Sequence, residues 1–291
     1  MGRKFVFSLA IICIGVLASF TVWNVFIAPD PIEPVYNPWW ALIVAGSNEN
    51  RFTHDAFCIY NTLIDHYNFT DHQTYLLTHH PSTWEGELPY PEQYGDPPIP
   101  WVYIPRDAVT SLTSIEWAVS QIADQVKPDD QVIIWWTGHG TNESGGLVDT
   151  GHPDDYISPT QLDNILDVIK CRQMIIFLGS CFSGAFINEL KEANRIIYTA
   201  SRENETSHAS VVAYSVWNRA IYHALDPDFS AYTADTDSNG RISLWEVYDY
   251  ANTVILNKFD DQHPQRWVGL NFSMNNRSDA HEYIANGYYL T

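Results

Sequence analysis

Basic residues are scarce in this sequence. Its 291 residues include 15 Lys and Arg against 35 Asp and Glu, so the formal net charge is −20 at pH 7. Proteins that bind nucleic acid align Lys and Arg along a stripe that meets the phosphates, and this sequence has no such stripe. The composition therefore excludes a nucleic-acid partner. A hydrophobic content of 45%, with 11 Trp, 17 Tyr and 13 Phe, is sufficient for the core of one large domain.

Cysteine is also scarce, with four in the chain. Cys13 lies in an N-terminal apolar segment, which leaves Cys58, Cys171 and Cys181 as an odd set. A Cys58–Cys171 disulfide with Cys181 free would fit an oxidising compartment, and two reduced structural thiols are the alternative. A disulfide requires a suitable separation of the two Cα atoms, so the sequence leaves both arrangements open.

Charged residues are absent from residues 5–27. This apolar segment is long enough for a transmembrane helix, which needs about 20 residues. A cleavable signal peptide, with a small-residue cleavage site near residues 16–19, is the alternative. The basic side chains within residues 1–4 keep that end inside and send the remainder out. We therefore expect an extracytoplasmic domain that is anchored to the membrane, or secreted if the segment is cleaved.

Two further features agree with export. Residues 28–38 are rich in proline and indicate a stiff, extended linker, so the folded domain should occupy residues 39–291. Acceptor sequons for N-glycosylation begin at Asn68, Asn142, Asn204, Asn271 and Asn276.

The domain alternates apolar β-rich runs with segments of helical periodicity, which predicts an α/β fold with a parallel sheet covered on both faces. Strands are expected at residues 39–45, 74–77, 131–136, 174–178 and 195–200. Helices are expected at residues 53–67, 108–126, 159–169, 185–192 and 208–225.

Two of the predicted strands end in reactive side chains. The run at residues 131–136 leads into Gly138-His139-Gly140, and the run at residues 174–178 leads into Gly179-Ser180-Cys181. Ligands of open α/β sheets bind outside the carboxyl ends of the strands. If the two strands are neighbours, His139 and Cys181 face each other there. An imidazole next to a thiol promotes the nucleophilic thiolate, so the pattern predicts a Cys–His dyad.

Several short motifs follow one another along residues 43–216. They are IVAGSN at residues 43–48, Arg51 followed by Asp55-Ala56, the run from DQV to GHG at residues 130–140, SC and SG within residues 180–184, YTA at residues 198–200, ETS at residues 205–207 and YSV at residues 214–216. This set resembles the legumain-type cysteine peptidases (asparaginyl endopeptidases), which are related to the transamidase that attaches GPI anchors. The resemblance covers residues 39–218 and implies a caspase-like three-layer sandwich with a mostly parallel central sheet.

The resemblance also implies roles for individual residues. Cys181 corresponds to the nucleophile and His139 to its partner base and acid. The backbone N–H groups of Cys181 and Gly140 would form the oxyanion hole. The family's third catalytic residue is an asparagine near the arginine of the substrate pocket, and Asn48 and Asn50 are the candidates here.

The substrate pocket departs from the family pattern. Arg51 matches the arginine that lines the P1 pocket, with Glu205 and Thr206 as further pocket residues, but two acidic positions are replaced by Gly179 and Val212. An arginine without counter-charges favours an acidic P1 side chain, because guanidinium pairs well with carboxylate. If Glu203 or Glu205 turned inward, neutrality and the family's asparagine preference would be restored.

A second motif, at residues 235–246, matches the EF-hand calcium loop. Gly240 permits the sharp turn, and the oxygen ligands would come from Asp235, Asp237, Asn239, Arg241, Ser243 and Glu246. A single loop of this kind is more typical of a structural Ca²⁺ site than of a sensor, because sensors open paired hands.

The sequence as a whole predicts a cysteine endopeptidase that acts on peptide or protein substrates through an acyl-enzyme, with no cofactor for catalysis. Capture of the same acyl-enzyme by an amine would make the protein a transpeptidase or transamidase. A catalytically silent, calcium-supported binding module is the alternative from another class.

Overall fold

The structure is a computed structural model. It describes residues 38–47, 49–79, 109–142, 147–149, 156–209, 214–226 and 234–269. The expected membrane segment at residues 5–27 lies outside this part of the chain. Among the described helices, none combines the length and apolar character needed to cross a membrane.

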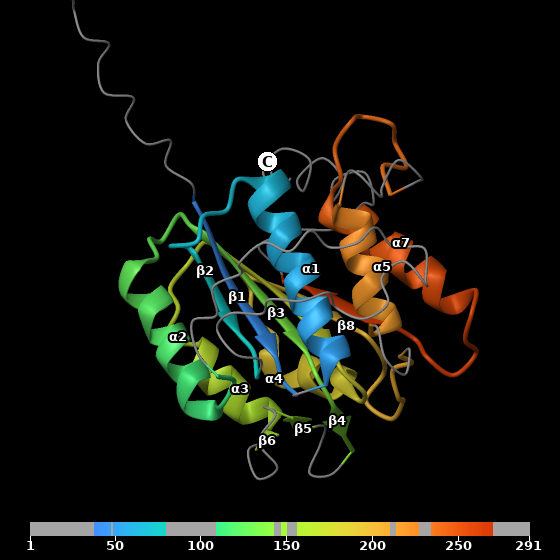
Figure 1. The fold of residues 1–291 in the computed structure, drawn as a ribbon, viewed down its shortest axis with the longest axis horizontal. Helices are drawn as coiled ribbons and strands as arrows, with labels where there is room; N and C mark the ends of the chain where they lie inside the picture. Colours follow the sequence, from blue (N-terminus) through green and yellow to red (C-terminus); the bar gives the residue numbers. More distant parts are fainter. Residues whose placement is uncertain are drawn as a thin grey trace, which may run out of the picture. The chain divides into compact units, whose positions relative to one another are not determined.

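A six-stranded sheet forms the centre of the described domain, with the strand order β2-β1-β3-β7-β8-β9 (Figure 1). Its strands are β1 (Trp39–Ala45), β2 (Thr74–Leu77), β3 (Gln131–Thr137), β7 (Gln173–Gly179), β8 (Arg195–Thr199) and β9 (Gln265–Val268). The first five pair in parallel, and β9 pairs antiparallel with β8 at the edge. A small antiparallel sheet follows β3 and consists of β4 (Gly140–Thr141), β5 (Leu147–Asp149) and β6 (Tyr156–Ile157).

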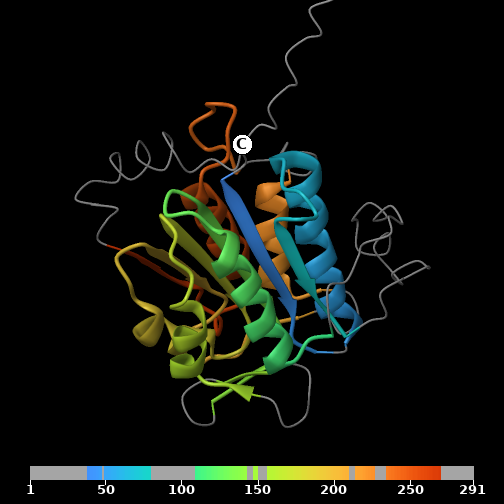
Figure 2. The same ribbon diagram turned by 90° about the vertical axis from the view of Figure 1, so that its left-hand side faces the viewer.

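Helices cover both faces of the central sheet, which gives three layers (Figure 2). One face packs against α1 (Asn50–Tyr67), α5 (Val216–Leu225) and α7 (Leu244–Leu256). The other packs against α2 (Leu112–Gln125), α3 (Pro159–Leu166), the short 3-10 helix η3 (Ser183–Phe186) and α4 (Ile187–Leu190). The predicted α/β fold with a mostly parallel sheet is confirmed in the described domain.

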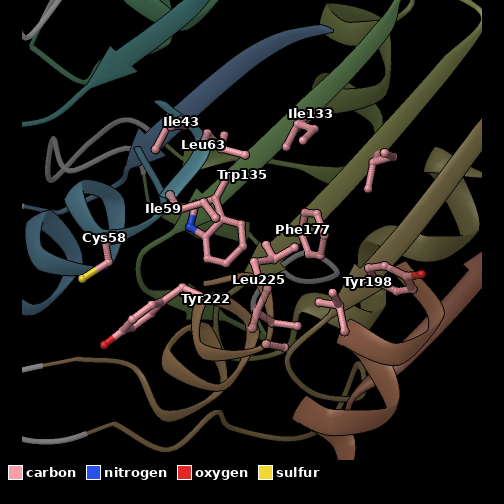
Figure 3. Close-up of a cluster of buried hydrophobic side chains, with 14 of the residues drawn as sticks. Ile43, Cys58, Ile59, Leu63, Ile133, Trp135, Phe177, Tyr198, Tyr222 and Leu225 are labelled. Atoms are coloured by element: carbon pink, nitrogen blue, oxygen red, sulfur yellow. The ribbon is translucent and has the colours of Figure 1, made fainter. Parts of the chain in front are cut away.

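The central strands are buried on both sides, as their continuous apolar sequences require. Successive side chains alternate between faces, so Trp135 joins the core under α1 and α5 while Trp136 joins the opposite core. In the first core, the Trp135 ring lies beside that of Phe177 (Figure 3), with 5.2 Å between the ring centroids. It also lies 6.4 Å from the ring of Trp217 in α5. These rings fix α5 against the strands that carry the two reactive residues.

Some predicted boundaries were wrong. Helix α1 begins at Asn50, three residues earlier than expected. Helix α5 begins only at Val216, because residues 201–209 form an irregular segment and Ala209 makes an isolated bridge to Ser215. Strand β9, within a region for which no element was predicted, closes one edge of the sheet.

Of the two cysteine arrangements that the sequence left open, the structure excludes the Cys58–Cys171 disulfide and has the two reduced thiols. Cys58 lies in the core on the α1 face, and Cys171 lies in the core on the opposite face. Because the sheet separates them, they cannot approach to the Cα separation of about 7 Å or less that a disulfide needs. All three cysteines in the described part of the chain are reduced.

Candidate active site

The register of β3 and β7 places His139 and Cys181 at the same level, just beyond the carboxyl ends of these two neighbouring strands; this end of the sheet is called the sheet edge below. Thr137 is the partner of Gly179 in this parallel pair, and each reactive residue stands two positions further on. A Cβ atom on Gly140 would lie 1.9 Å from the Cys181 carbonyl oxygen, so only glycine permits this close approach. The prediction that the two strands are neighbours is confirmed.

The Cys181 thiol faces the backbone of Ser207. The Ser207 N–H donates to Sγ at 3.2 Å, and Sγ lies 3.7 Å from the Ser207 carbonyl oxygen, to which it can donate. A thiol can use both contacts, whereas a thiolate can only accept. The N–H therefore stabilises the nucleophilic form of Cys181, which is half-buried and reachable from solvent.

His139 is held by a carboxylate that the sequence interpretation missed. Its Nε2 makes a very short contact with Oε1 of Glu49, and its ring stands edge-on to Phe52 at 5.1 Å. An Nε2–H that donates to a carboxylate leaves Nδ1 as the basic nitrogen. Asn48, one candidate for this position, lies outside the described residues. A glutamate directly before the first turn of α1, two residues from Arg51, was the signal available in the sequence.

Glu49 also provides a counter-charge for Arg51. Its second oxygen, Oε2, lies 2.9 Å from a terminal nitrogen of Arg51, and the guanidinium lies 4.6 Å from the centre of the Phe52 ring. The premise that Arg51 lacks a counter-charge is therefore wrong. One carboxylate thus joins the imidazole to the arginine. The buried Arg51 Nε has no hydrogen-bond partner among the residues that the structure describes.

The other expected pocket residues lie on the segment that faces Cys181. The Glu205 carboxylate accepts hydrogen bonds from the His263 N–H and Nδ1, at 2.8 and 2.9 Å, and lies 3.3 Å from the Arg202 guanidinium. Partial burial alone would raise the pKa of Glu205, but hydrogen bonds from the His263 and Arg202 backbones lower it overall. Glu203 and Thr206 are exposed. Neither Glu203 nor Glu205 is the ion-pair partner of Arg51 in this arrangement.

Asn218 explains why residue 179 is a glycine here, where the family resemblance implies an acidic residue. A Cβ atom on Gly179 would lie 2.0 Å from the Asn218 side-chain oxygen, so α5 fills this space. The Asn218 amide donates to Thr137 at 2.7 Å and to Asp55 at 3.0 Å, while the Ser215 N–H donates to the same Asp55 carboxyl at 3.2 Å. Val212, at the second substituted acidic position, lies outside the described residues.

Asp55 is fully buried beneath the two strand ends. Burial raises its pKa to about 7, although its hydrogen bonds with Ser215, Asn218 and Thr137 oppose this rise. The carboxyl therefore titrates near neutral pH within the core that supports the dyad.

The loop expected to bind calcium brings three carboxylates together. Oxygens of Asp235, Asp237 and Glu246 lie within 4.8 Å of one another, and Gly240 has the positive φ of 77° that the turn needs. Glu246 also caps α7, since its other oxygen accepts from the Ser243 N–H at 2.9 Å. This set of hard oxygen donors fits Ca²⁺.

Comparison with known proteins agrees with this geometry. The mostly parallel sheet with helices on both faces fits the caspase-like α/β fold, and His139 and Cys181 follow two neighbouring strands of it. The model of the Peptidase C13 family matches residues 113–277, which include His139 and Cys181, and the chain belongs to this family. It is thus a legumain-type cysteine peptidase by family. A search of curated proteins found no match.

Proposed function

We propose that this protein is an endopeptidase in which Cys181 is the nucleophile and His139 the general base and acid. The observation that carries the proposal is the shared edge of β3 and β7, where Gly140 approaches the Cys181 backbone and the Ser207 N–H meets Sγ. A nucleophile, a base and backbone donors at one sheet edge are what acyl transfer requires.

The reaction follows from these positions. The Cys181 thiolate attacks the scissile carbonyl, and the oxyanion is received by the N–H groups of Cys181 and Gly140. Protonated His139 gives a proton to the leaving amine, which breaks the peptide bond and leaves a thioester. Water then attacks the thioester, His139 takes its proton, and the carboxylic product and thiol are released.

Glu49 takes the orienting position that an asparagine has in the family. Its contact with Nε2 directs Nδ1 of His139 toward the reaction and stabilises the imidazolium that forms after proton uptake. Because the same carboxylate pairs with Arg51, it links the imidazole to the substrate pocket.

The Arg51–Glu49 pair favours an amide as the P1 side chain. An asparagine can accept from the guanidinium and donate to the carboxylate, whereas an acidic P1 group would meet Glu49 as a like charge. Thr206 stays a predicted pocket residue on the exposed rim. We therefore propose cleavage after asparagine rather than after aspartate or glutamate.

A P1 scan of the full-length chain tests this proposal, with Cys181→Ala as the control. Cleavage after Asn that is absent in the variant is the expected result. Cleavage after Asp or Glu would show that acidic side chains displace Glu49 from Arg51. If an added amine is joined to the acyl group, the protein is a transpeptidase. If neither reaction occurs and no peptide electrophile labels Cys181, it is a silent binding module.

We also propose that residues 235–246 bind a structural Ca²⁺ ion. Asp235, Asp237 and Glu246 would supply carboxylates and Asn239 a side-chain oxygen, with the Arg241 carbonyl and Ser243 completing the set. The bound charge would hold the start of α7 in place, and catalysis would use no step at the ion.

We further propose that the domain lies outside the cytoplasm, attached through the apolar residues 5–27. In support, Asn68, Asn142 and Asn204, the described asparagines that begin sequons, are exposed. An apparent mass that glycosidase treatment lowers is the expected result in eukaryotic expression, and an unmodified chain would count against export.

A further inference from the structure

A buried glutamine, Gln262, holds the segment that faces the nucleophile. Its side chain is fully buried. Its Nε2 donates to the Ala200 carbonyl at 2.9 Å and to Ser207 Oγ at 3.2 Å, and its Oε1 accepts from the His208 N–H at 2.8 Å. All three partners lie on residues 200–208, which connect β8 to the backbone opposite Cys181.

Two histidine–carboxylate contacts flank this glutamine. His208 Nε2 lies 2.7 Å from Asp261, and the His208 ring stacks on Phe259 at 4.0 Å. On the other side, His263 donates its backbone N–H to Glu205 at 2.8 Å. Residues 261–263 and residues 200–208 therefore meet along their length, and Gln262 is the buried centre of this contact.

The contact matters because residues 201–209 have little regular structure to fix them. They belong to no helix or strand of the described domain. Ser207 nevertheless has to present its N–H at 3.2 Å from Sγ, and hydrogen bonds weaken steeply as distance and angle depart from their optimum. Gln262 bonds both to the Ser207 hydroxyl and to the following N–H, so it fixes Ser207 through groups other than those that contact Cys181.

We propose that Gln262 is a positioning residue for the nucleophile. It sets the place of the Ser207 backbone and thereby the readiness of Cys181 to react as a thiolate. The inference rests on the proposed function, because it assumes that Cys181 is the nucleophile. It is distinct from that proposal, since Gln262 does not touch the reacting atoms.

A buried glutamine elsewhere in the molecule provides a matched control. Gln173 is also fully buried, at the start of β7 and thus at the opposite end of the strand from Cys181. Among the described residues, neither the nitrogen nor the oxygen of its side-chain amide has a hydrogen-bond partner. Gln262→Met and Gln173→Met keep a similar side-chain volume, so they differ in the hydrogen bonds removed and in distance from the thiol.

The test measures alkylation of Cys181 by iodoacetamide in the full-length chain as a function of pH. The thiolate displaces iodide to form a C–S bond, and peptide mass analysis separates Cys181 from the buried Cys58 and Cys171. In Gln262→Met we expect the rate at neutral pH to fall by about tenfold, the midpoint to move to higher pH, and the high-pH plateau to stay. Gln173→Met should match the wild-type profile.

Ser207→Ala removes only the hydroxyl that Gln262 holds, so it keeps the proposal testable if Gln262→Met fails to fold. It should shift the profile in the same direction by a smaller factor. Identical profiles for wild type and either of these two variants, or an equal shift in Gln173→Met, would overturn the positioning role. The proposed dyad is tested separately: if His139→Ala leaves the wild-type profile unchanged, the dyad fails whatever Gln262 does.

Discussion

Two Cys–His pairs in the described part of the chain share residue types and little else. In α1, Cys58 Sγ lies 3.8 Å from His54 Nε2, one helical turn away, and both side chains are buried. At the sheet edge, Cys181 is half-buried and the His139 side chain is 44% exposed. The Ser207 N–H meets the Cys181 sulfur, and the Glu49 carboxylate meets the imidazole of His139. Access for a substrate and groups that stabilise both charges distinguish a nucleophile from a core thiol.

Removing one sulfur atom at a time gives the largest expected difference between the pairs. Cys181→Ala should lower the peptide cleavage rate by about 10⁴-fold or more, because the acyl-enzyme can no longer form. Cys58→Ala should leave this rate unchanged and lower only the melting temperature, since a small core side chain is lost. Initial cleavage rates and melting temperatures of the two variants, each compared with the wild type, test this prediction. Equal losses of activity would remove the distinction between the two pairs.

The carboxylate behind the exposed imidazole is expected to have the next largest effect. Glu49→Ala should lower kcat by about 10²-fold, because His139 loses the group that fixes its orientation and balances its charge. Glu203→Ala removes an exposed glutamate near the same edge and serves as the control. Steady-state kinetics separate kcat from KM. A change in KM alone would assign Glu49 to the pocket and not to the histidine.

Binding of Ca²⁺ to residues 235–246 should stabilise the folded domain, because this loop leads into α7, which packs in the same core as α1 and α5. With Ca²⁺ at about 100 times its Kd, the free energy of unfolding should rise by about 2.7 kcal/mol, which corresponds to about 5–10 °C in Tm. Glu246→Gln should abolish this shift, and Glu116→Gln on α2 should retain it. Calorimetry in Ca²⁺ and in chelator measures both. An unchanged Tm in the wild type would refute the site.

The titration of Asp55 should change the free energy of unfolding less, per pH unit, than Ca²⁺ binding does. Its pKa is raised from 3.8 to about 7 in the folded state, so the folded protein binds the proton more tightly than the unfolded chain. The free energy of unfolding should therefore fall as the pH rises from 3.8 to about 7, by up to about 1.4 kcal/mol per pH unit. Asp55→Asn should flatten this slope. Denaturant titrations at pH 5 and 7.5 give the change in the free energy of unfolding between these pH values for the wild type and for Asp55→Asn. An equal change in the two proteins would show that Asp55 does not titrate in this range.

The sequence predicts the parts of the site that depend on local patterns. Continuous apolar runs identify β3 and β7, and their parallel pairing places His139 and Cys181 together. Glu49 was missed because the interpretation sought an asparagine, and a carboxylate contacting His139 across 90 residues leaves no local periodicity. Gln262 was missed for the same reason, since its partners stand 54 to 62 residues away. Polar contacts between distant segments follow from tertiary structure alone.

The position of Asn218 against Gly179 couples the residue types that these two positions can hold. A side chain at residue 179 would collide with the Asn218 amide at 2.0 Å, and Asn218 in turn holds Thr137 and Asp55. An acidic side chain at residue 179 requires a smaller residue 218, and a smaller residue 218 leaves Asp55 with one fewer donor. The effects of substitutions at residues 179 and 218 are therefore not expected to add, because the two side chains compete for the same space. In design terms, residues 179 and 218 have to be chosen together.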